Sequence, residues 1–483
     1  MTIESVIVLL AFPAFWAFAE WRLGLILCIA TAITQDPLRK ITADKPVFFV
    51  GLVAVVFMAA CLGAMVRRIS LNPNNIFKQY RQLIQPFLLF LLLVIAQAFN
   101  SYLRFANPVL TLLGVLTYVL PLFSMTFVYQ FVCRQGEFGI SQFVKWYIVL
   151  ITLALTTVYL EYSGYDWPVL GQIGDLLIIY DSETGHRLAA FSGSFRSPEI
   201  AAWHAMAAAC FVLIVGFSQR VSLPRWVTAA IVAALLLGLG MLTGRRKIAV
   251  ELAVFISSFF ILWIIFERGV GKLGIFAMTG AALIAYAWLA TDLRDGGNGH
   301  YTVSTDFSRY VDHTENAFRE VPSRFVELGI APVMWAYDSF GLFGAGLGAG
   351  TQGTQHFGGG TAISGAAEGG LGKITLELGV PGLFVMGWIA IWTFRYLWQI
   401  MRFASRHSQR MGRISFGLFS FLVANVAGFS VATQAYGDLF VLLILSWITS
   451  FLLAIPILVE REVHARRPAT LERPPPVFRP RPV

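Results

Sequence analysis

Residues 226–266 read WVTAAIVAALLLGLGMLTGRRKIAVELAVFISSFFILWIIF, two apolar runs joined by a short turn that carries Arg245, Arg246 and Lys247. Each run is about 20 residues long, the length of helix that crosses the hydrocarbon core of a bilayer. Neither run shows the alternation of polar and apolar residues that marks the strands of a barrel. The stretch therefore predicts two transmembrane helices with three cations between them.

The rest of the chain has the same character. Of its 483 residues, 57% are hydrophobic and 13% are charged, and the mean hydropathy is +0.69. These proportions exclude an ordinary soluble protein of this size. Apolar runs that predict further helices lie near residues 47–66, 85–103, 109–132, 143–162, 199–217, 273–290, 371–396, 414–432 and 440–459.

Residues 5–35 add one long helix or two short ones, because Glu20 and Arg22 interrupt the apolar run. We therefore predict an all-α fold, a polytopic transmembrane bundle of about 12 or 13 helices with a long, partly helical outer loop. The formal net charge of +9 does not indicate nucleic acid, because the cations are scattered over short loops and the C-terminal tail. Membrane lipids are the expected surroundings.

Basic loops set the orientation, since loops rich in Lys and Arg stay in the cytoplasm. They alternate correctly with the predicted spans and contain Arg67, Arg68, Lys78, Arg81, Arg220, Arg225, Arg395, Arg402, Arg406, Arg410 and Arg413. By the same count, the turn at 244–247 and two long loops, near 163–198 and 291–370, face outward. Residues 1–463 are predicted to form one transmembrane domain, and the Pro- and Arg-rich residues 464–483 a disordered cytoplasmic tail.

The second outer loop contains two distinct patterns. Residues 318–337 interleave apolar and charged side chains, which predicts an amphipathic helix on the membrane surface. The Gly-rich residues 341–350, and the further Gly-rich stretch that follows to Gly370, allow close backbone approach and mobility, as either a substrate-ordered lid or a plain flexible loop requires.

Several types of site are not expected. Cys28, Cys61, Cys133 and Cys210 lie in or beside apolar runs without metal-ligand spacing, so we expect packed thiols. The sequence contains no phosphate-binding P-loop, no dinucleotide fingerprint, no HExxH and no Asp-x-Asp pair. We therefore predict no cofactor, no metal and no nucleotide-driven catalysis.

A polar segment precedes the helix predicted at 199–217. It contains Arg187 and then GSFRSPE at 193–199, and His204 follows within the helix. Helix capping explains Ser197, Pro198 and Glu199. Capping does not explain Arg187 and Arg196, and His204 is open to two interpretations, a structural hydrogen bond or a functional role.

The cations at 245–247 lie on the same side as Arg187 and Arg196. Arginine grips phosphate oxygens in pairs, so a bound diphosphate is favoured over a plain headgroup anchor.

A third polar element, AEGGLGKITLELGVPGL at 367–383, leads the outer loop back into the membrane. Its Glu368 is a candidate general base or a helix cap. Lys373 and Glu377, one turn apart, could form an ion pair.

Together these motifs resemble the O-antigen ligase and Wzy-type O-antigen polymerase superfamily, over roughly residues 180–390. The resemblance implies a metal-independent, inverting glycosyltransferase of the bacterial inner membrane. Such an enzyme moves a glycan from an undecaprenyl-diphosphate carrier to a glycan hydroxyl on the periplasmic face. It implies as partners the lipid-linked oligosaccharide, a glycan acceptor and other polysaccharide-assembly proteins.

Residue by residue, Arg187 and Arg245 fall at the family's arginine positions and would bind the diphosphate. Arg196, Arg246 and Lys247 are local candidates for the same role. Many ligases carry a histidine where this chain has Glu368, so the base is either Glu368 itself or another residue, with His204 and His356 as candidates. This departure favours a polymerase of O-antigen or exopolysaccharide over a ligase.

Two rivals remain. A lipid-linked glycan or anion transporter could use outward arginines to grip its substrate, although transporters usually show related halves and the sequence shows no convincing internal repeat. A non-catalytic scaffold would leave the outer arginines without a role.

Overall fold

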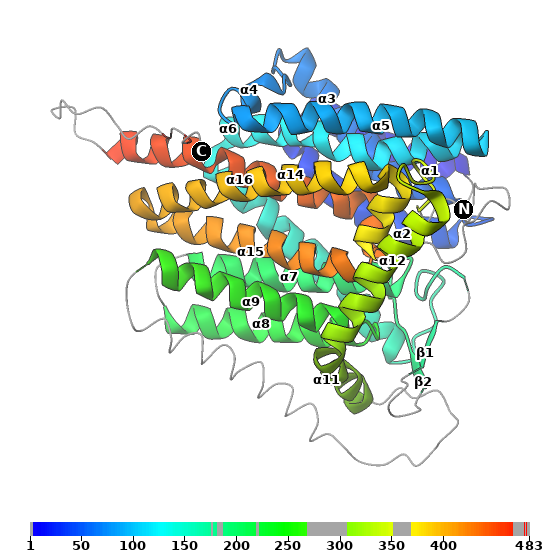
Figure 1. Ribbon diagram of the computed structural model, residues 1–483. Coiled ribbons are helices and arrows are strands. Elements are labelled where there is room, and N and C mark those ends of the chain that lie inside the picture. The colour runs from blue at the N-terminus through cyan, green and yellow to red at the C-terminus, as the bar shows by residue number, and fades with distance from the viewer. Residues whose placement is uncertain are drawn as a thin grey trace. The chain divides into compact units, whose positions relative to one another are not determined.

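The computed structural model describes residues 3–174, 177–180, 187–218, 222–267, 307–350, 369–466, 478 and 480 (Figure 1). These residues are almost entirely helical, and the strands among them form one two-stranded sheet. The chain divides into two compact units. Unit 1 comprises Met1–Arg68 and Phe138–Glu320, and unit 2 comprises Ile69–Glu137 and Val321–Val483.

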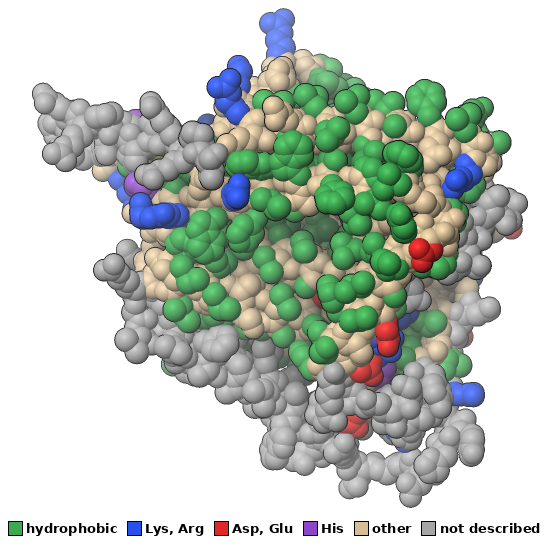
Figure 2. Space-filling view, in the orientation of Figure 1, with side chains coloured by type: hydrophobic (Ala, Val, Ile, Leu, Met, Phe, Trp, Pro, Cys, Tyr) green, Lys and Arg blue, Asp and Glu red, His purple; other side chains and the backbone are tan. Residues whose placement is uncertain are grey.

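The helices are those of a multi-pass membrane protein. Within the described residues, nine helices are long and apolar enough to span a bilayer, or up to ten if the bent pair α1 and α2 counts as one span. Figure 2 shows hydrophobic side chains spread across the helical face in view, as expected for helices that face lipid. The predicted polytopic helix bundle is confirmed at this level.

Unit 1 begins with a broken helix. The chain leaves helical geometry at Glu20 (φ −135°, ψ 80°), so the apolar N-terminal run forms two helices, as one of the two predicted alternatives stated. The elements of unit 1 are α1 (Ile3–Ala19), η1 (Trp21–Leu23), α2 (Gly24–Ile41), η2 (Val47–Gly51), α3 (Leu52–Val66), the second part of α6 (Pro108–Tyr162), β1 (Ile178–Tyr180), β2 (Arg187–Ala189), α7 (Pro198–Ser218), α8 (Leu223–Met241), α9 (Lys247–Phe266) and most of α11 (Phe307–Arg324).

Helix α7 is the buried helix of unit 1. In its most apolar stretch 89% of the residues are buried, and α8 and α9 pack against it. Small side chains permit this close packing. A Cβ atom added at Gly240 of α8 would lie 2.9 Å from the Cβ of Ala205 in α7, which is closer than side chains normally approach.

Unit 2 contains the remaining helices. They are α4 (Asn74–Phe77), η3 (Arg81–Leu83), α5 (Ile84–Phe105), the first part of α6, η4 (Phe325–Ile330), α12 (Ala331–Phe340), α14 (Gly370–His407), α15 (Gln409–Val431), η5 (Ala435–Gly437) and α16 (Leu439–Arg466). Helix α14 packs against α5, α12, α15 and α16.

The middle of the predicted Gly-rich stretch is packed inside unit 2. The chain is buried from Gly344 to Ala349, although Leu342 and Phe343 are exposed, and Ala345 donates its N–H to the carbonyl of Leu376 at 2.7 Å. Gly344 has φ +70°, and a Cβ there would lie 2.6 Å from the carbonyl oxygen of Leu376. The predicted close backbone approach is confirmed at these residues. The continuation of the stretch at 351–368 lies outside the described residues, so the choice between a lid and a flexible loop stays a prediction there.

The helix count differs from the prediction for identifiable reasons. The predicted helices at 109–132 and 143–162 are both present, but they meet directly at a kink at Gly136 (φ 68°, ψ −155°) and so count as the single element α6. A similar break at Gly379 (φ 72°, ψ −176°) interrupts α14. The helix predicted at 273–290 lies outside the described residues.

The outer loops also contain structure. The amphipathic helix predicted at 318–337 is helical as the consecutive elements α11, η4 and α12. The loop predicted at 163–198 holds an antiparallel hairpin that pairs Ile178 with Ala189, which the sequence did not predict. The single domain over residues 1–463 and the disordered tail stay predictions, and most of the tail lies outside the described residues.

Candidate functional site

The polar residues of unit 1 gather at one end of its helices. The C-terminal ends of α2 and α6, the turn after α8, and the N-terminal ends of α7 and α9 all contribute. The hairpin β1–β2 and α11 pack against the same turn and segment. The helices α7, α8 and α9 therefore present their outer ends, as counted from the basic loops, to a common region.

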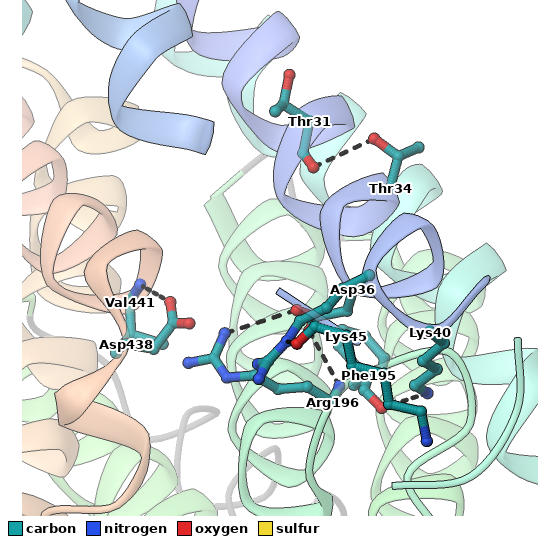
Figure 3. A network of polar contacts seen from close by, with 10 residues as sticks. Thr31, Thr34, Asp36, Lys40, Lys45, Phe195, Arg196, Asp438 and Val441 are labelled. Atoms are coloured by element: carbon teal, nitrogen blue, oxygen red, sulfur yellow. Dashed lines mark hydrogen bonds and ion pairs between the residues drawn. The ribbon is translucent and has the colours of Figure 1, made fainter. Parts of the chain in front are cut away.

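Lys40 of α2 anchors the segment that leads into α7. Its Nζ donates hydrogen bonds to the carbonyl oxygens of Val169, Gly193 and Phe195 at 3.2, 2.7 and 2.6 Å. Figure 3 shows the Lys40 side chain turned toward the backbone of Phe195. A single ammonium group thus ties α2 to two different parts of the loop between α6 and α7.

Side chains of helix α6 accept hydrogen bonds from the backbone N–H groups of the same segment. The Glu161 Oε2 accepts hydrogen bonds from the N–H groups of Ser192 and Gly193 at 2.9 and 2.6 Å. The Thr157 hydroxyl oxygen accepts one from Ser194 N–H at 2.7 Å. Gly193 has φ +58°, and a Cβ atom there would lie 2.5 Å from Thr157 Oγ1, so this position requires glycine. The segment before α7 is fixed by side chains from two other helices.

Arg196 is engaged by a buried carboxylate. Its backbone N–H donates to Asp36 Oδ2 at 3.0 Å, and its Nη1 lies 3.7 Å from Asp36 Oδ1 (Figure 3). The two side chains are only 10% and 4% exposed. A buried ion pair of this kind supports a structural role for Arg196, and its predicted role in diphosphate binding stays a prediction.

The arginine turn, residues 244–247, carries two further ion pairs. Arg245 pairs with Glu199 in the first turn of α7. Arg246 donates from both terminal nitrogens to the two oxygens of Glu320 in α11, at 3.2 and 2.6 Å. Gly244 has φ +68°, and a Cβ there would collide with Ile179 of β1, so the turn lies directly against the hairpin.

Helix α11 is attached to the hairpin by a second contact. The hydroxyl of Tyr310 donates to the carbonyl oxygen of Ala189 at 2.7 Å. Burial raises the pKa of Tyr310 above its usual range, with smaller contributions from Tyr162 and Glu161, so the phenol stays protonated and remains a donor. This contact involves neither Arg246 nor Glu320.

Lys247 and Glu251 lie one turn apart at the start of α9. Within the described part of the chain, neither the Lys247 Nζ nor either carboxylate oxygen of Glu251 has a hydrogen-bond partner, and Arg245 Nε has none either. Glu251 is 2% exposed. Lys247 lies within electrostatic range of Glu251, Arg245 and Glu199. The three cations of the arginine turn therefore lie near three carboxylates, those of Glu199, Glu320 and Glu251.

Arg187 is the exposed cation of the group. It opens β2, opposite Tyr180, and lies two residues before Ala189, which α11 contacts. Its side chain is exposed, and none of the described residues forms an ion pair or hydrogen bond with its guanidinium. The hairpin thus brings Arg187 to the same end of unit 1 as the arginine turn.

His204 lies in a packed aromatic environment. It is 3% exposed, its Nδ1 is 2.8 Å from the Tyr147 hydroxyl, and its ring stacks on Phe195 with centroids 5.5 Å apart. These contacts favour the structural interpretation that the sequence left open. The other two candidate bases, His356 and Glu368, lie outside the described residues.

Unit 2 contains a separate buried carboxylate. Glu377 is 0% exposed and accepts hydrogen bonds from the Tyr118 hydroxyl at 2.6 Å and from Gly350 N–H at 3.0 Å. No ion pair joins it to Lys373 among the described contacts, so the pair expected from their spacing gives way to these two bonds.

Other expectations concern thiols and metals. All four cysteines are free, and Cys28, Cys61 and Cys210 are buried, as expected for packed thiols. The described residues contain no group of three or more His, Cys, Asp or Glu side chains that could hold a metal ion.

Sequence reasoning missed several residues of this region, namely Asp36, Lys40, Glu161, Glu251 and Glu320. Glu251 carried a usable signal, since a lone carboxylate inside an apolar run normally has a function or a partner. Lys40 carried none, because its bonds to Gly193 and Phe195 join residues more than a hundred positions apart.

No protein-family model matches the chain, and no curated protein sequence matches it. The fold defines a multi-pass membrane protein.

Proposed function

We propose that the chain is a glycosyltransferase that uses a polyprenyl-diphosphate-linked glycan as donor and a glycan hydroxyl as acceptor, at the periplasmic face of a bacterial inner membrane. Polymerisation of a polysaccharide is the form of the reaction that the sequence motifs favour. The observation that carries the proposal is the gathering of Arg187 and the arginine turn at one end of unit 1, beside the N-terminal ends of α7 and α9.

The arrangement suits a diphosphate leaving group. As the acceptor oxygen bonds to the anomeric carbon, the bond from that carbon to the phosphate oxygen breaks and the electron pair leaves with the diphosphate. Fixed guanidinium groups and helix N-termini stabilise that developing charge. Removing one such donor costs about 2.7 to 4 kcal/mol of barrier in comparable oxyanion sites. A base must accept the proton of the acceptor hydroxyl, and Glu368, His356 and His204 remain the candidates.

Transfer to a different acceptor, as in an O-antigen ligase, uses the same donor chemistry and stays an alternative. A transporter is the second candidate, because α14 is broken at Gly379 two residues after the buried Glu377. Broken helices with ionisable groups are typical of transporter binding sites. The ion pairs of unit 1 favour the enzyme, since they lie at helix ends rather than mid-helix.

The test compares Arg245→Ala with Arg225→Ala. Arg225 lies near the start of α8, at the opposite end of the helix from the arginine turn, and is the matched control. With purified protein and lipid-linked donor, Arg245→Ala is expected to lower kcat/KM by about 100- to 1,000-fold, whereas Arg225→Ala stays near wild type. In cells, the Arg245 variant should accumulate lipid-linked repeat units without polymer.

Arg245→Ala also leaves Glu199 without its counter-ion, so folding needs its own control. The double variant Arg245→Ala with Glu199→Ala removes both charges and should fold while remaining inactive. Wild-type polymer formation by either variant would refute the proposed mechanism. A fully active Glu368→Gln variant would eliminate Glu368 as the base. Polymer formation in detergent solution, where no two compartments exist, separates the enzyme from a transporter.

A further inference from the structure

Carboxylates occupy both arginines of the turn. Arg245 pairs with Glu199 and Arg246 with Glu320, whereas Lys247 Nζ and the Glu251 oxygens have no hydrogen-bond partner among the described residues. The paired side chains are mostly shielded from solvent, with exposures of 25% and 14% for Arg245 and Glu199 and of 21% and 19% for Arg246 and Glu320. Both guanidinium groups are therefore paired before any ligand arrives.

A diphosphate brings at least two further negative charges. If both paired carboxylates kept their places, phosphate oxygens would lie beside them in a partly desolvated site, where like charges repel strongly. A phosphate group that binds a paired arginine through both terminal nitrogens must therefore replace the carboxylate of that arginine.

Glu320 is the carboxylate best placed to leave. Its two oxygens accept hydrogen bonds from the two terminal nitrogens of Arg246. A guanidinium binds a phosphate group in the same two-pronged way. It is more exposed than Glu199 or Glu251. Glu199 lies in the first turn of the buried helix α7, and Glu251 lies inside α9, whereas Glu320 lies in α11, which is not among the described helices that could span a bilayer.

We propose that Glu320 is a displaceable counter-ion, which occupies Arg246 in the donor-free protein and gives way to a phosphate group of the polyprenyl diphosphate. This inference rests on the proposed function. Donor binding then releases the end of α11 from the arginine turn, while the bond from Tyr310 to Ala189 keeps the start of α11 on the hairpin. The position of α11 reports whether the site is occupied.

The first experiment measures the binding of undecaprenyl diphosphate and of inorganic pyrophosphate to the full-length protein in detergent micelles. Glu320→Gln keeps the size of the side chain and removes its charge, so the Kd for undecaprenyl diphosphate is expected to fall about tenfold. Glu327→Gln is the matched control, because Glu327 is exposed in the next helical element and undergoes the same change of charge. It should bind as the wild type does.

The outcomes separate the two proposals. If Arg245→Ala and Arg246→Ala weaken binding but Glu320→Gln does not tighten it, the counter-ion inference is overturned and the proposed function stands. If neither arginine variant changes binding, the proposal that Arg245 and Arg246 bind the diphosphate is wrong. An equal gain in affinity for phosphatidylglycerol identifies a lipid-headgroup site instead, and also overturns the inference.

A second measurement uses the wild-type protein and so does not depend on the folding of a variant. Hydrogen exchange of the α11 amides is followed with and without undecaprenyl diphosphate. Displacement of Glu320 predicts faster exchange near the end of α11 in the presence of the lipid, with little change near Tyr310. Unchanged or slower exchange near Glu320 on saturation would contradict it.

Discussion

Replacing Lys40 by methionine tests the anchoring of the segment before α7. Methionine is similar in length but donates no hydrogen bond, so the carbonyls of Val169, Gly193 and Phe195 lose their common donor. Gly193 and Phe195 are buried, and a buried carbonyl left without a donor costs about 1 to 3 kcal/mol. Two such carbonyls predict that the free energy of unfolding falls by about 2 to 6 kcal/mol.

The assay is unfolding in mixed micelles of dodecyl maltoside and increasing SDS, followed by tryptophan fluorescence. Lys45→Met is the matched control, because Lys45 lies five residues further on with an exposed side chain and loses the same charge. The control should unfold as the wild type does. If Lys40→Met is no less stable than Lys45→Met, the three hydrogen bonds do not hold the segment, and the anchoring argument fails.

Two further predictions concern unit 2. Gly344→Ala should destabilise the protein by about 2 to 4 kcal/mol, because it forces a positive φ on alanine and brings the alanine Cβ against the carbonyl of Leu376. The control Gly387→Ala adds a Cβ in open space on α14 and should be neutral or stabilising. Equal stabilities in the same SDS titration would show that the Gly-rich segment is not tightly packed. Tyr118→Phe should lower stability by about 1.5 to 3 kcal/mol by taking a hydrogen bond from the buried Glu377, while Tyr102→Phe, at an exposed position of α5, should have no effect. Indistinguishable unfolding curves for the two tyrosine variants would contradict the Tyr118–Glu377 contact.

The spans were predictable because hydrophobic length alone specifies them. The run predicted at 247–266 coincides with α9, and the polar pair Glu20 and Arg22 did mark a helix break. The two helices of α6 were predicted, at 109–132 and 143–162, but their direct junction at Gly136 was not, since the polar residues between the two apolar runs suggested a loop.

Of the residues in the candidate site, only the cations could be predicted from the sequence. A turn of Arg245, Arg246 and Lys247 between two apolar helices is visible in the sequence. Its carboxylate partners come from α7 and α11, and nothing local in the sequence links Arg246 to Glu320, 74 residues away. The burial of the Gly-rich segment was missed for the same reason, since composition indicates flexibility while packing removes it.

The interleaving of the two units along the chain has a consequence for biosynthesis. The ribosome delivers α2 to the membrane long before Arg196 and the backbone of Gly193 exist, because Ile69–Glu137 of unit 2 is made in between. During that interval Asp36 and Lys40 are charged groups without their final partners at the end of a newly inserted helix. Nascent α2 therefore depends on the insertion machinery or on lipid headgroups to shelter these charges until the rest of unit 1 emerges.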